Sequence, residues 1–202
     1  MGQYENIMAA VEFIRSRSPL APRVGVVLGS GLGEFANRLE DAVAISFGEI
    51  PHFRKVSVAG HAGRLVLGTV GGVATALLQG RYHYYEGHAI EDVVFPVRVL
   101  GKLGITGLLL TNAAGGIGGE LRPGDLMIIR DHINGMGINP LRGGNDERLG
   151  PRFPDMSAVY DPEFQEVIAG AQIEIGLKPK RGVYLALSGP SYETVSYTHL
   201  TL

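Results

Sequence analysis

Residues 73–88 have the sequence VATALLQGRYHYYEGH, in which an apolar run is followed directly by polar and aromatic side chains. The run from Val73 to Leu78 is long enough for one buried strand, and Gly80 ends it. The residues that follow bind anions, transfer protons or stack: Arg81, His83, Tyr85, Glu86 and His88. Ligands of α/β proteins bind outside the carboxyl ends of strands, so the pattern favours a binding site over an ordinary polar surface loop.

Helix and strand signals alternate along the rest of the chain. Apolar spacing predicts helices over residues 4–17, 94–103 and 162–175, with Pro96 tolerable only near the first turn of the second helix. Short apolar runs predict strands, buried in most cases, at residues 24–28, 108–110, 126–129 and 183–187. The runs 65–70 and 73–78 predict a hairpin that turns at Gly71 and Gly72. Without an internal repeat or a linker, the pattern predicts one α/β domain.

Turns of glycine and other small residues follow three of these strands, at residues 29–33, 111–116 and 188–193. Such turns let backbone N–H groups converge on a phosphate, and a helix beginning near Glu34 would add its positive end. The first turn, GSGLG, lacks the Gly at position 34 of a dinucleotide fingerprint and the Gly-Lys of a P-loop. A plain tight turn and a phosphate nest both fit it. Close packing and close ligand approach both fit residues 112–116.

Composition excludes several functional classes. The 202 residues include 45% hydrophobic residues, enough for one well-packed domain, and 18 Lys and Arg against 20 Asp and Glu, so no basic field favours nucleic acid. Cysteine is absent, which excludes disulfides, zinc knuckles and thiol nucleophiles. The first 18 residues do not resemble a signal peptide, and no apolar run approaches membrane-spanning length. We expect a soluble cytoplasmic protein with no nucleic-acid or membrane partner.

Residues 131–160 show little periodicity. A segment of this length without regular structure is usually functional or disordered. Its apolar residues favour an ordered loop that closes a pocket or contacts a partner chain, with disorder as the alternative: Ile133, Met136, Leu141, Phe153 and Met156.

Several motifs in the same order resemble the low-molecular-weight, trimeric purine nucleoside phosphorylases. They are GSGLG at 29–33, GHAGR at 60–64, GRYHYYEG at 80–87, NAAGG at 112–116, the DHIN loop at 131–134 and GPSYET at 189–194. The resemblance spans nearly the whole chain to Thr194. It implies a nucleoside phosphorylase domain over residues 1–194, with a phosphorylase/hydrolase-like fold in which helices flank a central mixed β-sheet.

The resemblance also implies an activity. Members of this family carry out reversible phosphorolysis of 6-oxopurine ribonucleosides and deoxyribonucleosides, giving the free base and the sugar 1-phosphate. This implies purine nucleoside and inorganic phosphate as substrates, no cofactor, no metal, a homotrimer and a place in purine salvage. The glycosidic bond would break through an oxocarbenium-like ribosyl, with phosphate as nucleophile and counter-charge.

The matched positions suggest roles for individual residues. The phosphate site would use Ser30, His61, Arg81, His83 and the backbone of Ala113. The nucleoside would be held by Tyr85 at the ribose, Tyr192 and Glu193 at the base, and Phe153 from a neighbouring subunit. We assign His83 and Glu193 as catalytic, against the alternatives of ordinary loop histidines at 61 and 83 and a solvated charge at 193. His52, His88 and His132 are assigned structural roles.

The resemblance stops after Thr194. Residues 195–202, VSYTHLTL, resemble the translated read-through of a sequencing adapter, and we interpret them as an artefactual tail foreign to the family. Further purine- and ribose-binding residues follow this point in the family, so we expect a chain truncated at its C-terminus, incomplete in its fold, with little turnover. Ser196 and His199 are not interpreted as replacements for the missing groups.

Other functions remain open on the sequence. One is a purine or phosphate binder without catalysis, and another is a methylthioadenosine phosphorylase or a hydrolytic nucleosidase on the same fold. Phosphate dependence separates phosphorolysis from hydrolysis, and turnover separates an enzyme from a binder. The Glu193 carboxylate favours 6-oxopurines, because a 6-aminopurine has no N1–H to donate.

Overall fold

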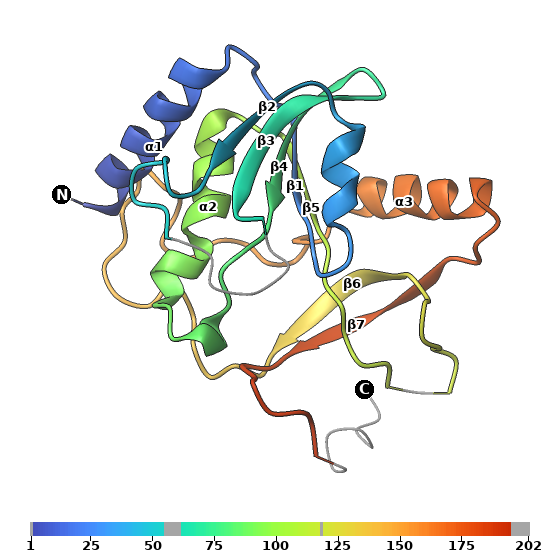
Figure 1. Ribbon diagram of the computed structural model, residues 1–202. Coiled ribbons are helices and arrows are strands. Elements are labelled where there is room, and N and C mark those ends of the chain that lie inside the picture. The colour runs from blue at the N-terminus through green and yellow to red at the C-terminus, as the bar shows by residue number, and fades with distance from the viewer. Residues whose placement is uncertain (1, 55–61, 118, 195–202) are drawn as a thin grey trace. The chain divides into compact units, whose positions relative to one another are not determined.

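A five-stranded mixed sheet, with strand order β2-β3-β4-β1-β5, organises the first of two compact units in the computed structural model (Figure 1). The structure describes residues 2–54, 62–117 and 119–194. The first unit comprises Met1–Ala113 and Pro140–Gly150, and the second comprises Ala114–Asn139 and Pro151–Leu202. The chain is a single α/β domain built from these units, as the sequence predicts.

The middle and one edge of this sheet are parallel. β1 (Val24–Val27) lies between β4 (Val73–Gln79) and β5 (Gly107–Leu110) and is parallel to both. Val27 lies opposite Leu78 on one side and Leu110 on the other, so the carboxyl ends of the strands are level. The turns that follow them therefore meet at one edge of the sheet.

The other edge of the sheet is antiparallel. β3 (Arg64–Val70) and β4 form the predicted hairpin, which turns at Gly71 and Gly72. β2 (Glu40–Ser46) extends the hairpin as an outer strand, which the sequence analysis did not predict. Most residues of β2 are exposed, so its apolar signal is weak.

Each face of the sheet carries a cluster of buried residues within this unit. Alternate side chains of a strand point to opposite faces, and the buried residues separate accordingly. Val27, Leu65 and Leu78 belong to the cluster that includes helices α1 (Gln3–Arg17) and α2 (Ile90–Leu103). Val26, Val66 and Leu77 belong to a second cluster, which includes Ala36 of the short 3₁₀ helix η1 (Gly33–Arg38).

Three expectations about this unit need correction. α2 begins four residues before the predicted start, so Pro96 lies inside it, where it is buried, and not in the first turn. The helix expected near Glu34 is the 3₁₀ helix η1. The predicted strand at 108–110 forms, but its leucines are 38–58% exposed, because β5 is the last strand on that edge of the described sheet.

The second unit contains a parallel pair of strands and one helix. β6 (Met127–Asn134) pairs with β7 (Lys180–Ala186). The helix α3 (Pro162–Glu174) is capped at its N-terminus by Asp161, whose carboxylate accepts hydrogen bonds from the N–H groups of Glu163 and Phe164. Residues 131–134, expected in a loop, are the second half of β6. Residues 135–160 form turns and irregular structure. Among the residues described, no helix is both long and apolar enough to cross a membrane.

Candidate active site

The turn after β1 is fixed at its start by a close backbone contact. The Gly29 N–H donates to the Thr111 hydroxyl over 2.7 Å, joining the ends of β1 and β5. A Cβ on residue 29 would lie 2.7 Å from the Thr111 carbonyl oxygen, so this approach requires glycine. Gly31 has a φ of 84°, which also favours glycine. Ser30 lies between them, exposed at the carboxyl edge of the sheet.

The same turn is fixed at its far end by Gln79, the last residue of β4. The Gln79 amide donates to the Gly33 carbonyl over 2.8 Å and accepts a hydrogen bond from the Arg64 guanidinium. Both ends of the Gly29–Gly33 turn are therefore held by side chains from neighbouring strands. This favours a preformed loop over a mobile one.

Arg81 follows β4 and reaches across to the end of β5. Its Nη1 donates to the Thr111 carbonyl over 2.7 Å, and its Nε donates to His83 Nε2 over 3.3 Å. The guanidinium is thus held beside the turn that follows β5, which contains Ala113. A fixed guanidinium at this edge supplies the fork geometry that matches phosphate oxygens.

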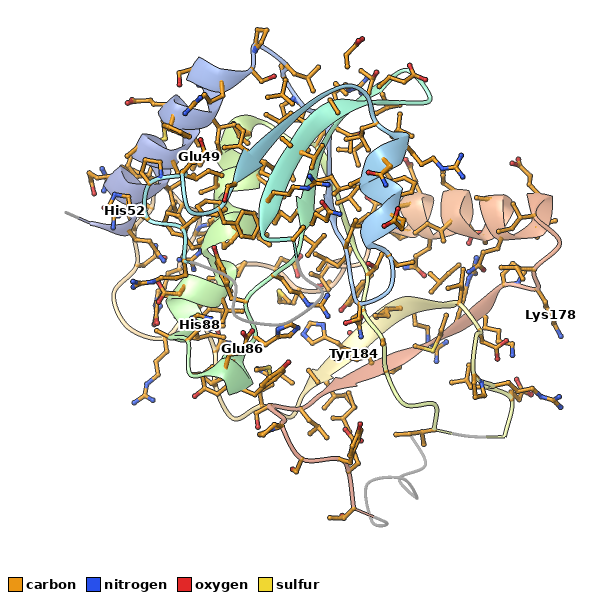
Figure 2. The ribbon with its side chains drawn as sticks, viewed as in Figure 1. Glu49, His52, Glu86, His88, Lys178 and Tyr184 are labelled. Carbon is orange, nitrogen blue, oxygen red and sulfur yellow. The ribbon has the colours of Figure 1, made fainter. Side chains whose placement is uncertain are left out.

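His83 is held by a buried carboxylate. Glu86, at the end of the 3₁₀ helix η2 (Tyr84–Glu86), accepts hydrogen bonds from the His83 backbone N–H over 2.7 Å and from Nδ1 over 2.8 Å. The Glu86 side chain is only 6% exposed. Figure 2 shows Glu86 on the short helix between β4 and α2, with His88 just after it in the chain.

The hydrogen bonds of His83 indicate the tautomer of its ring. Nδ1 carries a proton that it donates to Glu86, while Nε2 accepts from Arg81. A neutral imidazole protonated on Nδ1 satisfies both bonds, and we assign this tautomer from the hydrogen-bond pattern. The Tyr85 ring stacks on His83 with centroids 5.0 Å apart, and Tyr85 is about half exposed.

The histidines assigned structural roles pack against aromatic rings. His88 lies 5.3 Å from the ring of Tyr82, whose buried hydroxyl donates to the Arg54 carbonyl. Burial raises the pKa of the Tyr82 hydroxyl far above its ordinary value. His132 Nδ1 lies 3.1 Å from the Tyr160 hydroxyl, and burial likewise raises the pKa of Tyr160.

The residues expected at the base lie in the second unit. Tyr192 is 96% exposed and Phe153 is 86% exposed, and Glu193 is also exposed. The Arg152 guanidinium lies 5.7 Å from the centre of the Phe153 ring. The structure therefore joins Arg81, His83 and Tyr85 in the first unit and places Ser30 and Ala113 in the turns after the neighbouring strands, whereas the expected base contacts belong to the other unit. His61 lies outside the described residues.

Two residues important to this geometry were not identified in the sequence. Thr111 and Gln79 each join different strands, and both stand where an apolar strand gives way to a glycine-containing turn. A polar residue at such a junction is the only signal that could have indicated them. Among the side chains that the structure describes, no group of three or more His, Asp and Glu could hold a metal ion.

Comparisons with known proteins identify the class first. A family model described as the phosphorylase superfamily matches residues 23–200, so the chain is a member of that superfamily. Two relatives named purine nucleoside phosphorylase 1 are each 48% identical to it. The match to the relative from Geobacillus stearothermophilus spans 93% of this chain and 69% of that relative. The match to the relative from Bacillus subtilis spans 94% of this chain and 70% of that relative.

A solved structure agrees with the sequence relatives. Isoform 2 of purine nucleoside phosphorylase from Schistosoma mansoni, in complex with cytosine and ribose-1-phosphate, superposes with a TM-score of 0.91 at 40% identity. The match covers 96% of this chain and 70% of that structure. The chain therefore belongs to the purine nucleoside phosphorylases, which are enzymes of the glycosyltransferase class.

Proposed function

We propose that the reaction of this enzyme is the reversible phosphorolysis of 6-oxopurine ribonucleosides and deoxyribonucleosides, with phosphate bound at the carboxyl edge of β1, β4 and β5. The observation that carries the proposal is the Arg81–His83–Glu86 array beside the Ser30 turn. It places a fixed cation, a neutral imidazole and a small-residue loop together at the ends of parallel strands. Such sets bind oxyanions.

Phosphate would be held by groups of different kinds. Arg81 supplies charge-assisted hydrogen bonds to the phosphate oxygens, while the Ser30 hydroxyl and the Ala113 backbone N–H fix their orientation. Bound phosphate would replace Arg81 Nε at His83: Nε2 would accept a hydrogen bond from a phosphate hydroxyl, because Glu86 keeps the ring proton on Nδ1, and Arg81 Nε would donate to a phosphate oxygen. His61 is proposed as a further phosphate contact from outside the described residues.

The reaction needs accurate placement of phosphate and no covalent enzyme intermediate. A phosphate oxygen forms a bond to C1′ of the sugar as the bond from C1′ to the purine nitrogen breaks. The bonding electron pair leaves with the base, which takes up a proton, and the sugar passes through an oxocarbenium-like state. The phosphate charge beneath C1′ stabilises that cation, so the residues that position phosphate also lower the barrier.

The nucleoside contacts are proposed from the matched motif positions. Glu193 accepts the N1–H of a 6-oxopurine, which stabilises the base as it leaves, and Tyr192 forms a wall against its ring. Tyr85 contacts the ribose from its place against His83. Phe153 covers the nucleoside of a neighbouring subunit in a homotrimer, and its exposed side chain in the single chain supports this role.

The broader setting is also a proposal. We place the enzyme in the cytoplasm, in purine salvage, with inorganic phosphate as co-substrate and without a cofactor or metal. The domain runs over residues 1–194. The ribose-1-phosphate bound to the Schistosoma mansoni relative, which is a product of phosphorolysis, supports this choice of chemistry.

The test is phosphate-dependent product formation from inosine. With phosphate present, ³¹P NMR should show ribose 1-phosphate in the same amount as the hypoxanthine released, and both should be absent without phosphate. Hypoxanthine released without phosphate would instead establish a hydrolase. Binding of inosine and phosphate without turnover would establish a binder, and preferential turnover of methylthioadenosine would reassign the substrate.

A further inference from the structure

We propose that Thr111 is a positioning residue of the phosphate site, which fixes the Ser30 turn through its hydroxyl and Arg81 through its backbone carbonyl. The inference rests on the proposed function, because it concerns residues that are proposed to bind phosphate. Thr111 itself need not contact phosphate. It determines where two other groups can meet the anion.

The hydroxyl of Thr111 makes two hydrogen bonds at the end of β1. It accepts the Gly29 N–H over 2.7 Å and donates to the Val27 carbonyl over 3.0 Å. Gly29 is buried, so its N–H would have no water to replace this acceptor. The hydroxyl thus fixes the first residue of the turn that carries Ser30.

The backbone carbonyl of Thr111 holds Arg81 in place. It accepts Arg81 Nη1 over 2.7 Å, and Arg81 in turn contacts His83, which Glu86 holds. A continuous set of hydrogen bonds therefore runs from Gly29 through Thr111 to Arg81, His83 and Glu86. It joins the ends of three strands that are distant in sequence.

This arrangement leaves the middle of the turn exposed while both of its ends are fixed. Gln79 holds Gly33 at the far end, and Ser30 and Gly31 between the two anchors are exposed. Donors that are already in position lose little freedom when an anion binds, so they bind it more tightly. A loose start of the turn should therefore weaken phosphate binding specifically.

Thr111→Val tests this role by replacing the hydroxyl with a methyl group of similar size. The backbone carbonyl that accepts Arg81 is retained, so the variant isolates the hydroxyl. We expect phosphate affinity, measured by isothermal titration calorimetry with inorganic phosphate, to fall about tenfold, because one buried N–H loses its acceptor. Affinity for inosine should change less than about twofold, since loss of that acceptor acts on the phosphate turn alone. Amide hydrogen exchange at Gly29 should become faster.

Three other variants control for nonspecific effects. Thr111→Ser keeps the hydroxyl and should retain phosphate affinity. Thr106→Val removes an exposed hydroxyl at the other end of β5, where it donates to the Arg23 carbonyl over 3.2 Å, and should leave phosphate binding unchanged. If Thr111→Val does not fold, Thr111→Cys, whose thiol is a much weaker acceptor, should show a smaller loss of phosphate affinity.

The outcomes separate this inference from the proposed function. Unchanged phosphate affinity in Thr111→Val, with a wild-type chain that binds phosphate, would overturn the role of Thr111 alone. An equal loss of phosphate and inosine affinity would also overturn it, since it would indicate general damage. A wild-type chain that does not bind phosphate would overturn the proposed function and this inference with it.

Discussion

The groups proposed to bind phosphate and those proposed to bind the base differ in how the chain supports them. In the first unit, Arg81 and His83 are each held by identified partners, ending at the buried Glu86. In the second unit, Tyr192 and Phe153 are almost fully exposed. We infer that the phosphate groups are preorganised, whereas the base contacts are enclosed only when a ligand or a neighbouring chain covers them.

Strand ends explain this difference. Three parallel strands that end level with one another bring backbone groups and short polar side chains together, so an anion site can be built from local turns and hydrogen bonds. A purine presents a large apolar face with a few polar edges. It needs aromatic cover, which loops and partner chains supply more readily than strand ends do.

Arg81→Ala should have the largest effect, and it should reduce phosphate affinity alone. Loss of charge-assisted contacts worth about 1.5–3 kcal/mol should weaken phosphate binding by roughly 10- to 150-fold. Inosine affinity should change little. Calorimetry with phosphate and with inosine measures both, and Arg15→Ala, an exposed charge on α1, is the matched control.

An Arg81→Ala variant with wild-type phosphate affinity would remove Arg81 from the phosphate site. A loss of inosine affinity of equal size would show that the two sets of groups are not separable. Either result would contradict the proposed difference between the groups that bind phosphate and those that bind the base.

Glu193→Gln should affect recognition of the base and leave the phosphate site unaffected. The carboxylate accepts N1–H from hypoxanthine or guanine. The Gln amide oxygen can still accept this proton but without the negative charge, and loss of the charge-assisted hydrogen bond should cost about 1–3 kcal/mol, or roughly 5- to 150-fold in kcat/KM for inosine. The gap between inosine and adenosine should narrow, because an amide can also donate to the N1 lone pair of adenine. Phosphate affinity should not change.

The measurement is kcat/KM for inosine and adenosine, with Glu174→Gln as a control for the loss of one exposed carboxylate. Unaltered discrimination between the two nucleosides would rule out Glu193 as the base-recognition group. It would leave the phosphate assignment intact.

The structure around the proposed phosphate site could be predicted from the sequence better than that around the proposed base contacts, for a physical reason. Apolar runs that end in glycine-rich turns are local features, so the strands 24–28 and 73–78, the hairpin and the position of Arg81 could all be predicted. The bonds that hold them could not, because Thr111 and Gly29 are separated by 82 residues in sequence. Only the alignment of β1 and β5 brings them together.

The corrections have equally specific causes. Pro96 was expected near a helix start, yet α2 accommodates it inside the helix, where it is buried. β2 has mostly exposed residues and a register shift between Glu40 and Val43, which weakens the alternation that predicts strands. Burial at residues 108–110 could not be predicted, because it depends on what lies beyond the edge of the sheet.

Phe153→Ala should have a moderate effect that depends on assembly. If Phe153 covers a neighbouring subunit's nucleoside, the KM for inosine should rise about 2- to 10-fold, the range expected for a lost aromatic contact. Specific activity of the wild type should fall when the protein is diluted below the dissociation range of the trimer. Initial rates and light scattering over the same concentrations measure both.

Phe164→Ala, which removes another exposed aromatic ring in the second unit, is the control for surface changes. A fully active monomer at assay concentrations would exclude the proposed role of Phe153. The base contacts would then have to be enclosed by the chain itself.

The smallest effect is expected from Arg148, which belongs to the first unit but makes its contacts away from the phosphate groups. It pairs with Asp146 at 2.6 Å and with Glu5 of α1 at 2.7 Å, and its guanidinium lies 4.1 Å from the centre of the Tyr4 ring. These hydrogen bonds lower the pKa of Glu5 and of Asp146 below their ordinary values of 4.5 and 3.8. Arg148 and Glu5 are exposed and Asp146 is only partly buried, so the gain in stability is small.

The pH dependence follows from the direction of these shifts. A carboxylate whose pKa is lowered by folding stabilises the fold above its unfolded pKa, and this contribution is lost as the pH falls through the folded value. Arg148→Met should therefore lower the melting temperature slightly near pH 7, and the difference from wild type should shrink as the pH falls below about 4. High salt should shrink it as well.

Arg142→Met, in the same segment, is the control. Its difference in melting temperature from wild type should not depend on pH in this way, and phosphate affinity should be unchanged in both variants. A difference between Arg148→Met and wild type that is undiminished at pH 3 would mean that Arg148 stabilises the first unit by packing on Tyr4 and not by its ion pairs.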